Sequence, residues 1–321
     1  MYKMIIKKPI FWDKKRPDLL SIILLPFTIP LIINNILINF LSKEKSKKIK
    51  TICIGNIYLG GTGKTPFTIK LYKILKKLGH NVVVGKKYYK NQYDEQTILK
   101  NETTLITEKN RKKIIDKAIK NKKEILIFDD GLQERKIEYD LKIVCFDNQN
   151  WIGNGHLIPS GPLRESIKSL KKYDAVVLKQ SEDSEENKEI THEINKINPN
   201  IKIFYTYYTP LNLDMFDLSK KYIVFSGIGN SLNFRELLKK NNFNIVEEKI
   251  YPDHFNYNQK NIDDILKRAE NIDAEIVTTE KDFMKIANLN HGKINFLKVD
   301  MKIKNINGMT NFLKEKINGQ D

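Results

Sequence analysis

Strand-like and helix-like patterns alternate along the chain from residue 46 onward. Short apolar runs predict buried strands at Thr51–Gly55, Asn81–Val84, Glu124–Phe128, Lys142–Phe146 and Asp174–Leu178. After the first run, apolar side chains recur at helical spacing and predict a helix from Thr65 to about Leu78. Continuous apolar strands separated by helices are typical of a parallel sheet covered on both faces. We therefore expect a doubly wound α/β fold.

A second, shorter series of the same kind begins near Lys221. It runs through YIVFSG, a helix over Ser231–Lys240, a strand over Phe243–Glu247, a helix over Asn261–Ala269 and the sequence EIVTTEKD. The stretch between the two series, Ile201–Leu218, is rich in Tyr and Thr, and we expect it to be an extended connector. The expected domains are thus a main domain over 46–200, a connector over 201–220 and a smaller α/β domain over 221–321.

The N-terminal region contains a long apolar stretch. Residues 19–41 carry no charge, and about 20 apolar residues suffice for a helix to span a bilayer. Pro26 and Pro30 are expected to kink such a helix, and interspersed asparagines lower its hydropathy. A helix lying obliquely in one leaflet therefore competes with a full span, and a buried helix of a soluble protein is the remaining alternative. We expect residues 1–45 to form a membrane-associated segment.

Composition adds a strong positive charge to this picture. Lys and Arg number 56 against 39 Asp and Glu, a formal net charge of +17. This balance favours an anionic partner such as nucleic acid, anionic lipid or a phosphorylated substrate, although heavy use of Lys, Asn and Ile throughout would also produce it. The sequence holds no RNP pattern or zinc-finger spacing, so we expect no nucleic-acid partner. Cys53 and Cys145 lie inside apolar runs and are expected to be core residues.

The sequence TICIGNIYLGGTGKTPFTIKLYKIL reads as a buried strand, a glycine-rich loop and an amphipathic helix. This context predicts a P-loop that binds a nucleoside triphosphate, in a sheet of the P-loop NTPase type, because backbone N–H groups at the start of a helix attract phosphate. Lys64 is expected to reach the β- and γ-phosphates, and Thr65 to give its hydroxyl to Mg²⁺. Tyr58 stands where the usual pattern has a small first residue. The expected nucleotide-binding residues of the loop are Tyr58, Leu59, Gly60, Gly61, Thr62, Gly63, Lys64 and Thr65.

The run EILIFDD ends in two carboxylates and resembles a Walker B element, which supports the metal in P-loop proteins. Asp129 and Asp130 would emerge at the carboxyl edge of the sheet, beside the P-loop. The alternative is a solvated turn after a strand. His254, in YPDHF, and Asp94 and Glu95, in QYDEQ, carry little information alone, although a base paired with a histidine would suit a hydroxyl nucleophile.

The chain as a whole resembles the tetraacyldisaccharide 4′-kinase family, LpxK, of lipid A biosynthesis. The resemblance runs from about Pro9 to Lys285 and rests on the motifs GNIYLGGTGKTP, DDGLQ, GNGHLIPSGPLRE, SGIGN, YPDHF and TEKD, in that order. It implies transfer of the ATP γ-phosphate to the 4′-hydroxyl of an acylated glucosamine disaccharide 1-phosphate, giving lipid IVA. It also implies an inner-membrane lipid surface as a partner. Nothing in the sequence indicates an oligomeric state.

The resemblance also implies roles for individual residues. Lys64 and Arg164 become catalytic candidates, and Gln133 would line the nucleotide site. His254 would pair with Asp94 as the base acting on the sugar hydroxyl. The residues implied for the metal and its surroundings are Thr65, Asp129, Asp130 and Glu165.

Three departures from the family pattern bear on these roles. Lys86 stands where the family has an arginine, and it cannot make the same bidentate contact. Asp94 and Glu95 are flanked by Tyr93 and Gln96 in place of Gly and Pro, so their alignment is the weakest. Glu134 replaces a histidine that usually follows DDGLQ.

The apolar stretch also bears on location. Lysines flank it on both sides, so the positive-inside rule gives no orientation. Because ATP is cytosolic, we expect the protein at the cytoplasmic face of the bacterial inner membrane, anchored by its N-terminal segment.

Two other functions remain open from the residues alone. One is a P-loop switch ATPase that cycles on a membrane, under which GNGHLIPSGPLRE and PDH have no evident purpose. The other is a soluble P-loop kinase or ligase acting on a small anionic metabolite, which would be fully soluble without detergent.

Overall fold

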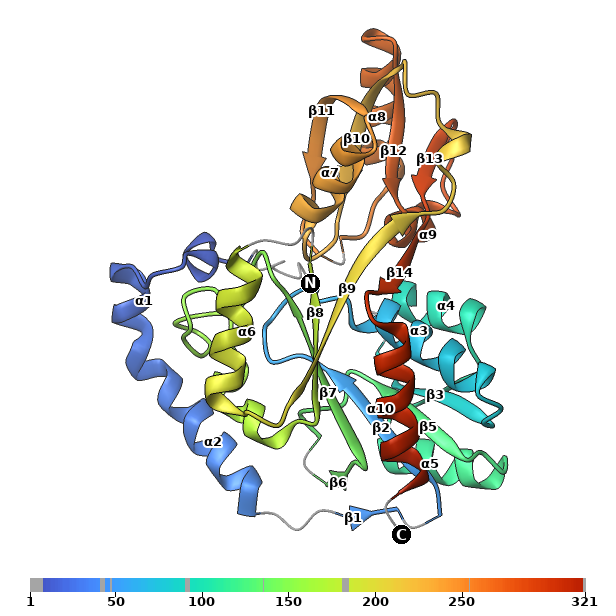
Figure 1. Ribbon diagram of the computed structural model, residues 1–321. Helices are drawn as coiled ribbons and strands as arrows, with labels where there is room; N and C mark the ends of the chain where they lie inside the picture. The colour runs from blue at the N-terminus through green and yellow to red at the C-terminus, as the bar shows by residue number, and fades with distance from the viewer. Residues whose placement is uncertain are drawn as a thin grey trace. The chain divides into compact units, whose positions relative to one another are not determined.

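The computed structural model describes residues 8–40, 44–46, 48–89, 93–134, 136–180, 185–253 and 255–319 (Figure 1). These residues group into two compact units, each treated by itself. The larger unit draws on the ranges 8–88, 99–207 and 303–319, and the smaller draws on 89–98 and 208–302. The chain therefore leaves the larger unit twice and returns to it for its last helix.

Seven neighbouring strands of an eight-stranded sheet, from β9 to β4, form the core of the larger unit. The order of the sheet is β14-β9-β8-β7-β2-β5-β3-β4, and each neighbouring pair from β9 to β4 is parallel. This confirms the predicted parallel α/β sheet. The strands are β2 (Lys50–Gly55), β3 (Val82–Lys87), β4 (Leu105–Glu108), β5 (Ile125–Asp129), β7 (Leu141–Asp147), β8 (Ala175–Lys179), β9 (Lys202–Pro210) and β14 (Val299–Ile303).

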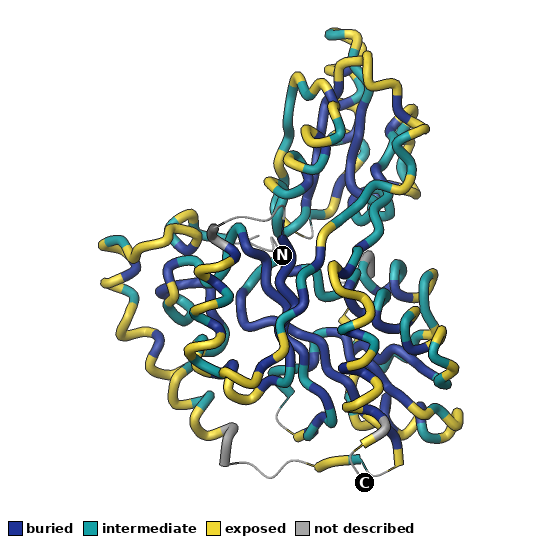
Figure 2. Tube along the Cα trace, in the orientation of Figure 1, coloured by how far each residue is buried: buried dark blue, intermediate teal, exposed yellow. Residues whose placement is uncertain are grey.

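Helices cover both faces of this sheet, so its central strands are buried over nearly their whole length (Figure 2) and are mostly apolar. Helices α5 and α6 pack on the face that carries Phe128 and Phe146. Helix α3 lies on the opposite face, where Thr68 contacts Asp129, and α10 packs on that face through Phe312. The bounds are α3 (Lys64–Lys77), α5 (Arg111–Lys120), α6 (Glu185–Ile197) and α10 (Ile306–Asn318).

The smaller unit has a parallel four-stranded sheet of its own, in the order β11-β10-β12-β13. Helix α8 packs on one face, beside Phe225, and α7 packs on the other, beside Tyr222. Two hydrophobic clusters on opposite faces give this unit a core of its own. Its elements are β10 (Lys221–Ser226), α7 (Ser231–Lys240), β11 (Asn244–Ile250), α8 (Gln259–Asn271), β12 (Ala274–Thr279), α9 (Glu280–Ile286) and β13 (Ile294–Leu297).

Two segments depart from the ranges expected from the sequence. The stretch expected to be a connector contains β9, a full member of the eight-stranded sheet, followed by the short 3₁₀ helix η4 (Leu213–Met215). The last helix, α10, packs on the large sheet through Phe204 and Phe312, whose ring centroids are 5.4 Å apart. The P-loop unit therefore includes the C-terminal helix, which the sequence interpretation assigned to the smaller domain.

The N-terminal segment is helical and largely exposed. It consists of η1 (Ile10–Asp13), α1 (Leu19–Leu24), the 3₁₀ turn η2 (Leu25–Thr28) and α2 (Ile29–Phe40). The expected interruption occurs at Pro26, inside η2. By length and composition, Leu19–Leu37 is long and apolar enough to cross a membrane, and only 11% of its most apolar part is buried. Apolar side chains of this segment that are at least half exposed are Ile10, Leu19, Leu20, Ile22, Ile23, Phe27, Ile29, Ile33, Ile36 and Leu37.

The remaining short elements connect these parts. Strands β1 (Glu44–Lys45) and β6 (Ile137–Glu138) form a small parallel pair. Helix α4 (Tyr93–Glu102) and the 3₁₀ helix η3 (Ile167–Lys172) complete the described elements.

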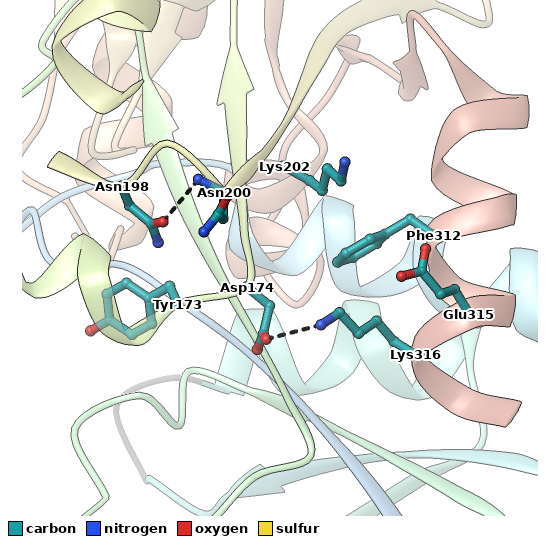
Figure 3. A pocket seen from close by; sticks show the side chains of 8 residues that line it. All are labelled: Tyr173, Asp174, Asn198, Asn200, Lys202, Phe312, Glu315 and Lys316. Atoms are coloured by element: carbon teal, nitrogen blue, oxygen red, sulfur yellow. Dashed lines mark hydrogen bonds and ion pairs between the residues drawn. The ribbon is translucent and has the colours of Figure 1, made fainter. Parts of the chain in front are cut away.

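A polar cavity of about 250 Å³ lies at the edge of the large sheet where β8 and β9 begin (Figure 3). Asp174 precedes β8, Lys202 starts β9, and Phe312 and Lys316 of α10 close one side. Lys316 is paired with Asp174 at 3.6 Å. The P-loop follows the carboxyl end of β2, at the other edge of this parallel sheet, so the cavity is separate from the phosphate site.

Candidate active site

The P-loop lies where the order of strands in the large sheet reverses. From β2 the chain goes to β3 on one side and later to β7 on the other, and such points open a crevice at the carboxyl ends of the strands. The loops after β2, β5 and β7 leave the sheet at this edge. They carry GGTGKT, DDGLQ and GPLRE, so three motifs that are far apart in the sequence meet at one place.

The loop ends in the geometry that phosphate binding requires. Gly63 precedes α3 with φ 80°, and Gly60 has φ 154°, so both positions favour glycine. Among the described residues, no side chain caps the N-terminus of α3. The first-turn N–H groups of the helix are therefore available to an anion, and the helix dipole favours one.

Asp129, the last residue of β5, accepts hydrogen bonds from two threonines in the first turns of α3. Its Oδ2 accepts from Thr65 Oγ1 at 3.1 Å, and its Oδ1 accepts from Thr68 Oγ1 at 3.2 Å. The carboxylate is almost fully buried. The Walker B interpretation of Asp129 rests on this direct link to Thr65, because the same hydroxyl is the one expected to bind Mg²⁺.

Asp130, the second carboxylate, is held by a strained backbone. It has φ 62°, a conformation uncommon for a residue with a side chain, and its N–H donates to Ile54 O at 2.8 Å. Its Oδ1 lies 3.6 Å from Arg164 Nη1 and 4.0 Å from Lys64 Nζ. The turn thus places one carboxylate between the two cations expected to act on phosphate.

Gln133 links DDGLQ to GPLRE. Its Nε2 donates to Asn56 O at 2.9 Å and to Glu165 Oε1 at 3.2 Å, and its Oε1 accepts from Arg164 Nη1 at 3.2 Å. The hydroxyl of the buried Tyr173 donates to Glu165 Oε2 at 3.2 Å, and burial, reinforced by Glu165, raises the pKa of Tyr173 well above its ordinary value. The structure therefore brings Gln133, Arg164 and Glu165 together, as expected.

The P-loop and GPLRE are also joined through their backbones. Leu59 N donates to Pro162 O at 2.8 Å, and Arg164 N donates to Ile57 O at 2.7 Å. Tyr58, which departs from the usual pattern, is buried between these bonds and bridges to Leu163. The first turn of the P-loop is therefore built on the segment that carries Arg164.

Lys86, which the resemblance matches to an arginine, is paired with Asp129. Its Nζ donates to Asp129 Oδ2 at 2.6 Å, and both side chains are buried. A single ammonium cannot reproduce a bidentate contact, but it supplies a positive charge beside the carboxylate.

The donor set fits a nucleoside triphosphate with Mg²⁺. Asn56 Oδ1 and Thr62 Oγ1 are buried in the loop and find no hydrogen-bond partner among the described residues, as expected of groups that meet a ligand. Thr65, Asp129 and Asp130 offer hard oxygen ligands. The described residues hold no group of three His, Cys, Asp or Glu that could bind a metal, and Mg²⁺ in nucleotide sites needs only one or two carboxylates besides phosphate and water.

The structure does not describe the side chains of the two residues expected to act as the general base, Asp94 and His254. His254 lies outside the described residues, and Asp94 lies in α4 with a side chain outside the described part. Their sequence neighbours Glu95 and Asp253 are described, and Lys281 bridges them, with Nζ 3.5 Å from Glu95 Oε1 and 3.3 Å from Asp253 Oδ1. These three residues belong to the smaller unit.

Both cysteines are buried and free, as predicted. Burial raises the pKa of Cys145 to about 12 and that of Cys53 further still. A nucleophilic role for either thiol is excluded, because the thiolate is the reactive form.

Sequence reasoning missed several residues that contact the candidate residues or their neighbours. Thr68 could have been found, since it follows Thr65 by three positions and so shares its helix face. Arg111 had no signal, although it donates to Asp130 O and to Glu134 Oε2, the latter at 3.2 Å. Lys281 lies in TEKD, but nothing in that motif predicts the bridge between Glu95 and Asp253.

The fold and the loop geometry define a P-loop protein of the α/β class. Comparison with known proteins narrows this. The model of the LpxK family, tetraacyldisaccharide-1-P 4′-kinase, matches residues 20–318. The chain belongs to this family.

Individual related proteins are similar to this chain over nearly its whole length. The tetraacyldisaccharide 4′-kinase of Pelagibacter ubique (strain HTCC1062) is 47% identical over 316 residues, which cover 97% of this chain and 98% of the relative. That of Rickettsia canadensis (strain McKiel) is 35% identical over 328 residues and covers 96% of each chain. The crystal structure of LpxK from Aquifex aeolicus in complex with ATP has a TM-score of 0.67 and 22% identity, and it covers 93% of this chain and 100% of that one. That likeness confirms the fold.

Proposed function

We propose that this protein transfers the γ-phosphate of ATP to the 4′-hydroxyl of a tetraacyldisaccharide 1-phosphate, a step of lipid A biosynthesis. Membership of the LpxK family over nearly the whole chain carries the proposal. The joined motifs GGTGKT, DDGLQ and GPLRE support it, because they place the hydrogen-bonded set of Gln133, Arg164 and Glu165 beside the P-loop.

Positioning and electrostatics account for most catalysis of this kind, since phosphoryl transfer needs little covalent help from the protein. The N–H groups of residues 58–65 would hold the phosphates, and Lys64 would place its ammonium at the β- and γ-phosphates. Arg164, held by Gln133 beside Asp130, would stabilise the charge on the transferring group. Mg²⁺, when bound, would be held by Thr65 and the carboxylates of Asp129 and Asp130, with Glu165 nearby, and would neutralise phosphate charge.

The acceptor hydroxyl needs a base, and we assign this role to Asp94 with His254. The sugar oxygen attacks the γ-phosphorus, the bond to the ADP oxygen breaks, and the hydroxyl proton passes to Asp94. The Lys281 bridge supports this assignment, because it ties α4 to the loop that carries the PDH motif. Lys281 thereby holds the neighbours of both proposed residues within one unit of the protein.

The substrate and the N-terminal segment point to a membrane surface. An acylated substrate resides in a lipid phase, and Leu19–Leu37 is apolar and mostly exposed. We assign the protein to the cytoplasmic face of the bacterial inner membrane, where ATP is available, with this segment in the lipid. Its flanking lysines and the net charge of +17 favour the anionic substrate and anionic lipid.

Mass spectrometry of the lipid product tests the proposed function. Tetraacyldisaccharide 1-phosphate dispersed in detergent is incubated with the full chain, ATP and Mg²⁺, and the lipid is analysed. We expect a product heavier by one phosphate, formed only when nucleotide and metal are both present. An unchanged authentic lipid, with the protein folded and ATP consumed, would instead favour the switch ATPase.

A further inference from the structure

Helix α1, in the apolar N-terminal segment, makes a buried polar contact with another part of the larger unit, the segment GNGHLIPSG. Ser21 is fully buried, and its Oγ donates to Ser160 O at 2.7 Å and accepts from Asn154 Nδ2 at 3.0 Å. In return, Ser160 Oγ donates to Ser21 O at 2.7 Å. A helix held only by lipid would not need such directional bonds. They fix the helix in one rotation and at one height against the segment GNGHLIPSG.

The same segment continues directly into the P-loop contacts. Residues 154–160 hold Ser21, and residues 162–164 pair with the first turn of the P-loop through Leu59 N to Pro162 O and Arg164 N to Ile57 O. The segment 154–164 therefore contacts helix α1 through its first part and the P-loop through its last part.

Two further bonds connect the N-terminal segment to site residues without an intermediary. Asn35 Nδ2, on α2, donates to Arg164 O at 3.0 Å. The hydroxyl of Tyr58 donates to Asp13, and Lys8 Nζ lies 4.5 Å from the centroid of the Tyr58 ring. The contacts reach the first residue of the P-loop pattern and the arginine of GPLRE, at two separate points.

We infer that residues 8–37 are a positioning element of the phosphate site, in addition to any contact they make with lipid. Asn35 holds the backbone of Arg164, and the Asp13 contact holds Tyr58 at the start of the P-loop. Loss of either bond leaves a polar group of the site without its partner and lets the catalytic geometry relax, and small misplacements of catalytic groups are costly. Asn35 acts through Arg164 and is a positioning residue.

This inference rests on the proposed function only in placing ATP beside Arg164. It also explains the unusual Tyr58, because a small residue at that position could not reach Asp13. If the segment only anchors the protein, its apolar area alone should affect function. If it also positions the phosphate site, replacing one of its polar residues with an apolar one should lower activity.

The test compares two variants, one at the polar residue Asn35 and one at its apolar neighbour Ile36. Asn35→Leu keeps the volume, removes the amide donor and makes the helix more apolar. Ile36→Ala is the matched control, since Ile36 is 50% exposed and its side chain is purely apolar. For the full chain in detergent we would measure kcat, KM for ATP, affinity for a fluorescent ATP analogue, and partition onto vesicles of anionic and neutral phospholipid.

For Asn35→Leu we expect kcat to fall about five- to tenfold and KM for ATP to rise, the loss being that of one hydrogen bond. Vesicle partition should remain at least at the wild-type level. For Ile36→Ala we expect weaker vesicle partition with unchanged KM and analogue affinity. Wild-type kcat and KM in Asn35→Leu would overturn the inference.

Tyr58→Phe is a second variant in case Asn35→Leu does not fold. It keeps the buried ring and removes only the hydroxyl that meets Asp13, and we expect weaker binding of the ATP analogue with unchanged vesicle partition. Unchanged analogue affinity would contradict the inference at this end. Analogue binding does not require phosphate transfer, so failure of the kinase assay in the wild type and failure of the positioning role are distinguishable.

Discussion

Lys86 Nζ donates to Asp129 Oδ2 over 2.6 Å, with both side chains buried. The same carboxylate oxygen accepts from Thr65 Oγ1. A lysine therefore supplies positive charge beside the oxygens proposed to support Mg²⁺. Because both charged groups are buried away from water, each stabilises the charged form of the other.

Removing Lys86 should destabilise the protein. Lys86→Met leaves the Asp129 carboxylate without its cation, and breaking a buried ion pair costs about 3–5 kcal/mol in free energy of unfolding. Urea unfolding of the full chain in detergent measures this loss. Lys86→Arg is the matched control, because it keeps the charge. A loss below about 1 kcal/mol in Lys86→Met would show that the pair is not important for stability.

Lys64→Ala should lose nearly all phosphate transfer. Its ammonium is expected at the β- and γ-phosphates, and a lost charge-stabilising group commonly lowers kcat by about 10²–10³. Lys77→Ala, on the exposed last turn of α3, is the control and should retain wild-type kcat. Comparable kcat values for the two variants would remove Lys64 from the mechanism.

Asp94→Ala should lower turnover far more than ATP binding. The proposed task of Asp94 is at the sugar hydroxyl, so kcat falls while affinity for nucleotide persists. Parallel measurement of kcat and of binding of a fluorescent ATP analogue separates the two effects, and Glu95→Ala serves as the neighbour control. Near-normal turnover in Asp94→Ala, with a large loss in Glu95→Ala, would move the base to Glu95.

Lys281→Ala should reduce kcat several-fold. Without its ammonium, the link from Glu95 to Asp253 is lost, and α4 and the PDH loop are no longer held together. Lys267→Ala, an exposed lysine on α8 of the same unit, should leave kcat unchanged. If the two variants behave alike in steady-state kinetics, the bridge has no bearing on the base.

Deletion of residues 1–41 should impair both membrane association and catalysis. The exposed apolar residues of α1 and α2 are removed, together with the bonds from Asn35 and Asp13. Sedimentation with vesicles and transfer to the lipid substrate would be measured on the same preparation. A soluble truncated protein with undiminished transfer would argue against both a lipid anchor and a positioning role.

Much of the fold follows from local patterns in the sequence. The apolar runs at β2, β5, β7, β8 and β10 appear as strands within a residue or two of their expected bounds, because buried parallel strands must be apolar on both faces. The P-loop was equally evident, since its glycines have a local conformational cause. Strand β9 escaped notice because only one of its faces is well buried, so its Tyr- and Thr-rich sequence reads as a connector.

The long-range contacts of the site could not be predicted from the sequence. Arg111 and Asn35 reach Asp130 and Arg164 across many residues, and no spacing rule connects such positions. Motif matching did identify Gln133, Arg164 and Glu165, and the structure shows why they occur together: each donates to or accepts from another. The roles of Asp94, His254 and the metal ligands stay predictions.

The fate of labelled γ-phosphate tests the central claim most directly. ATP labelled at the γ-position is incubated with wild-type protein or Lys64→Ala and detergent-dispersed tetraacyldisaccharide 1-phosphate, and label is counted in the lipid and in free phosphate. We predict label in the lipid with the wild type and none with Lys64→Ala. Label released only as free phosphate, from folded protein and authentic lipid, would contradict the kinase function.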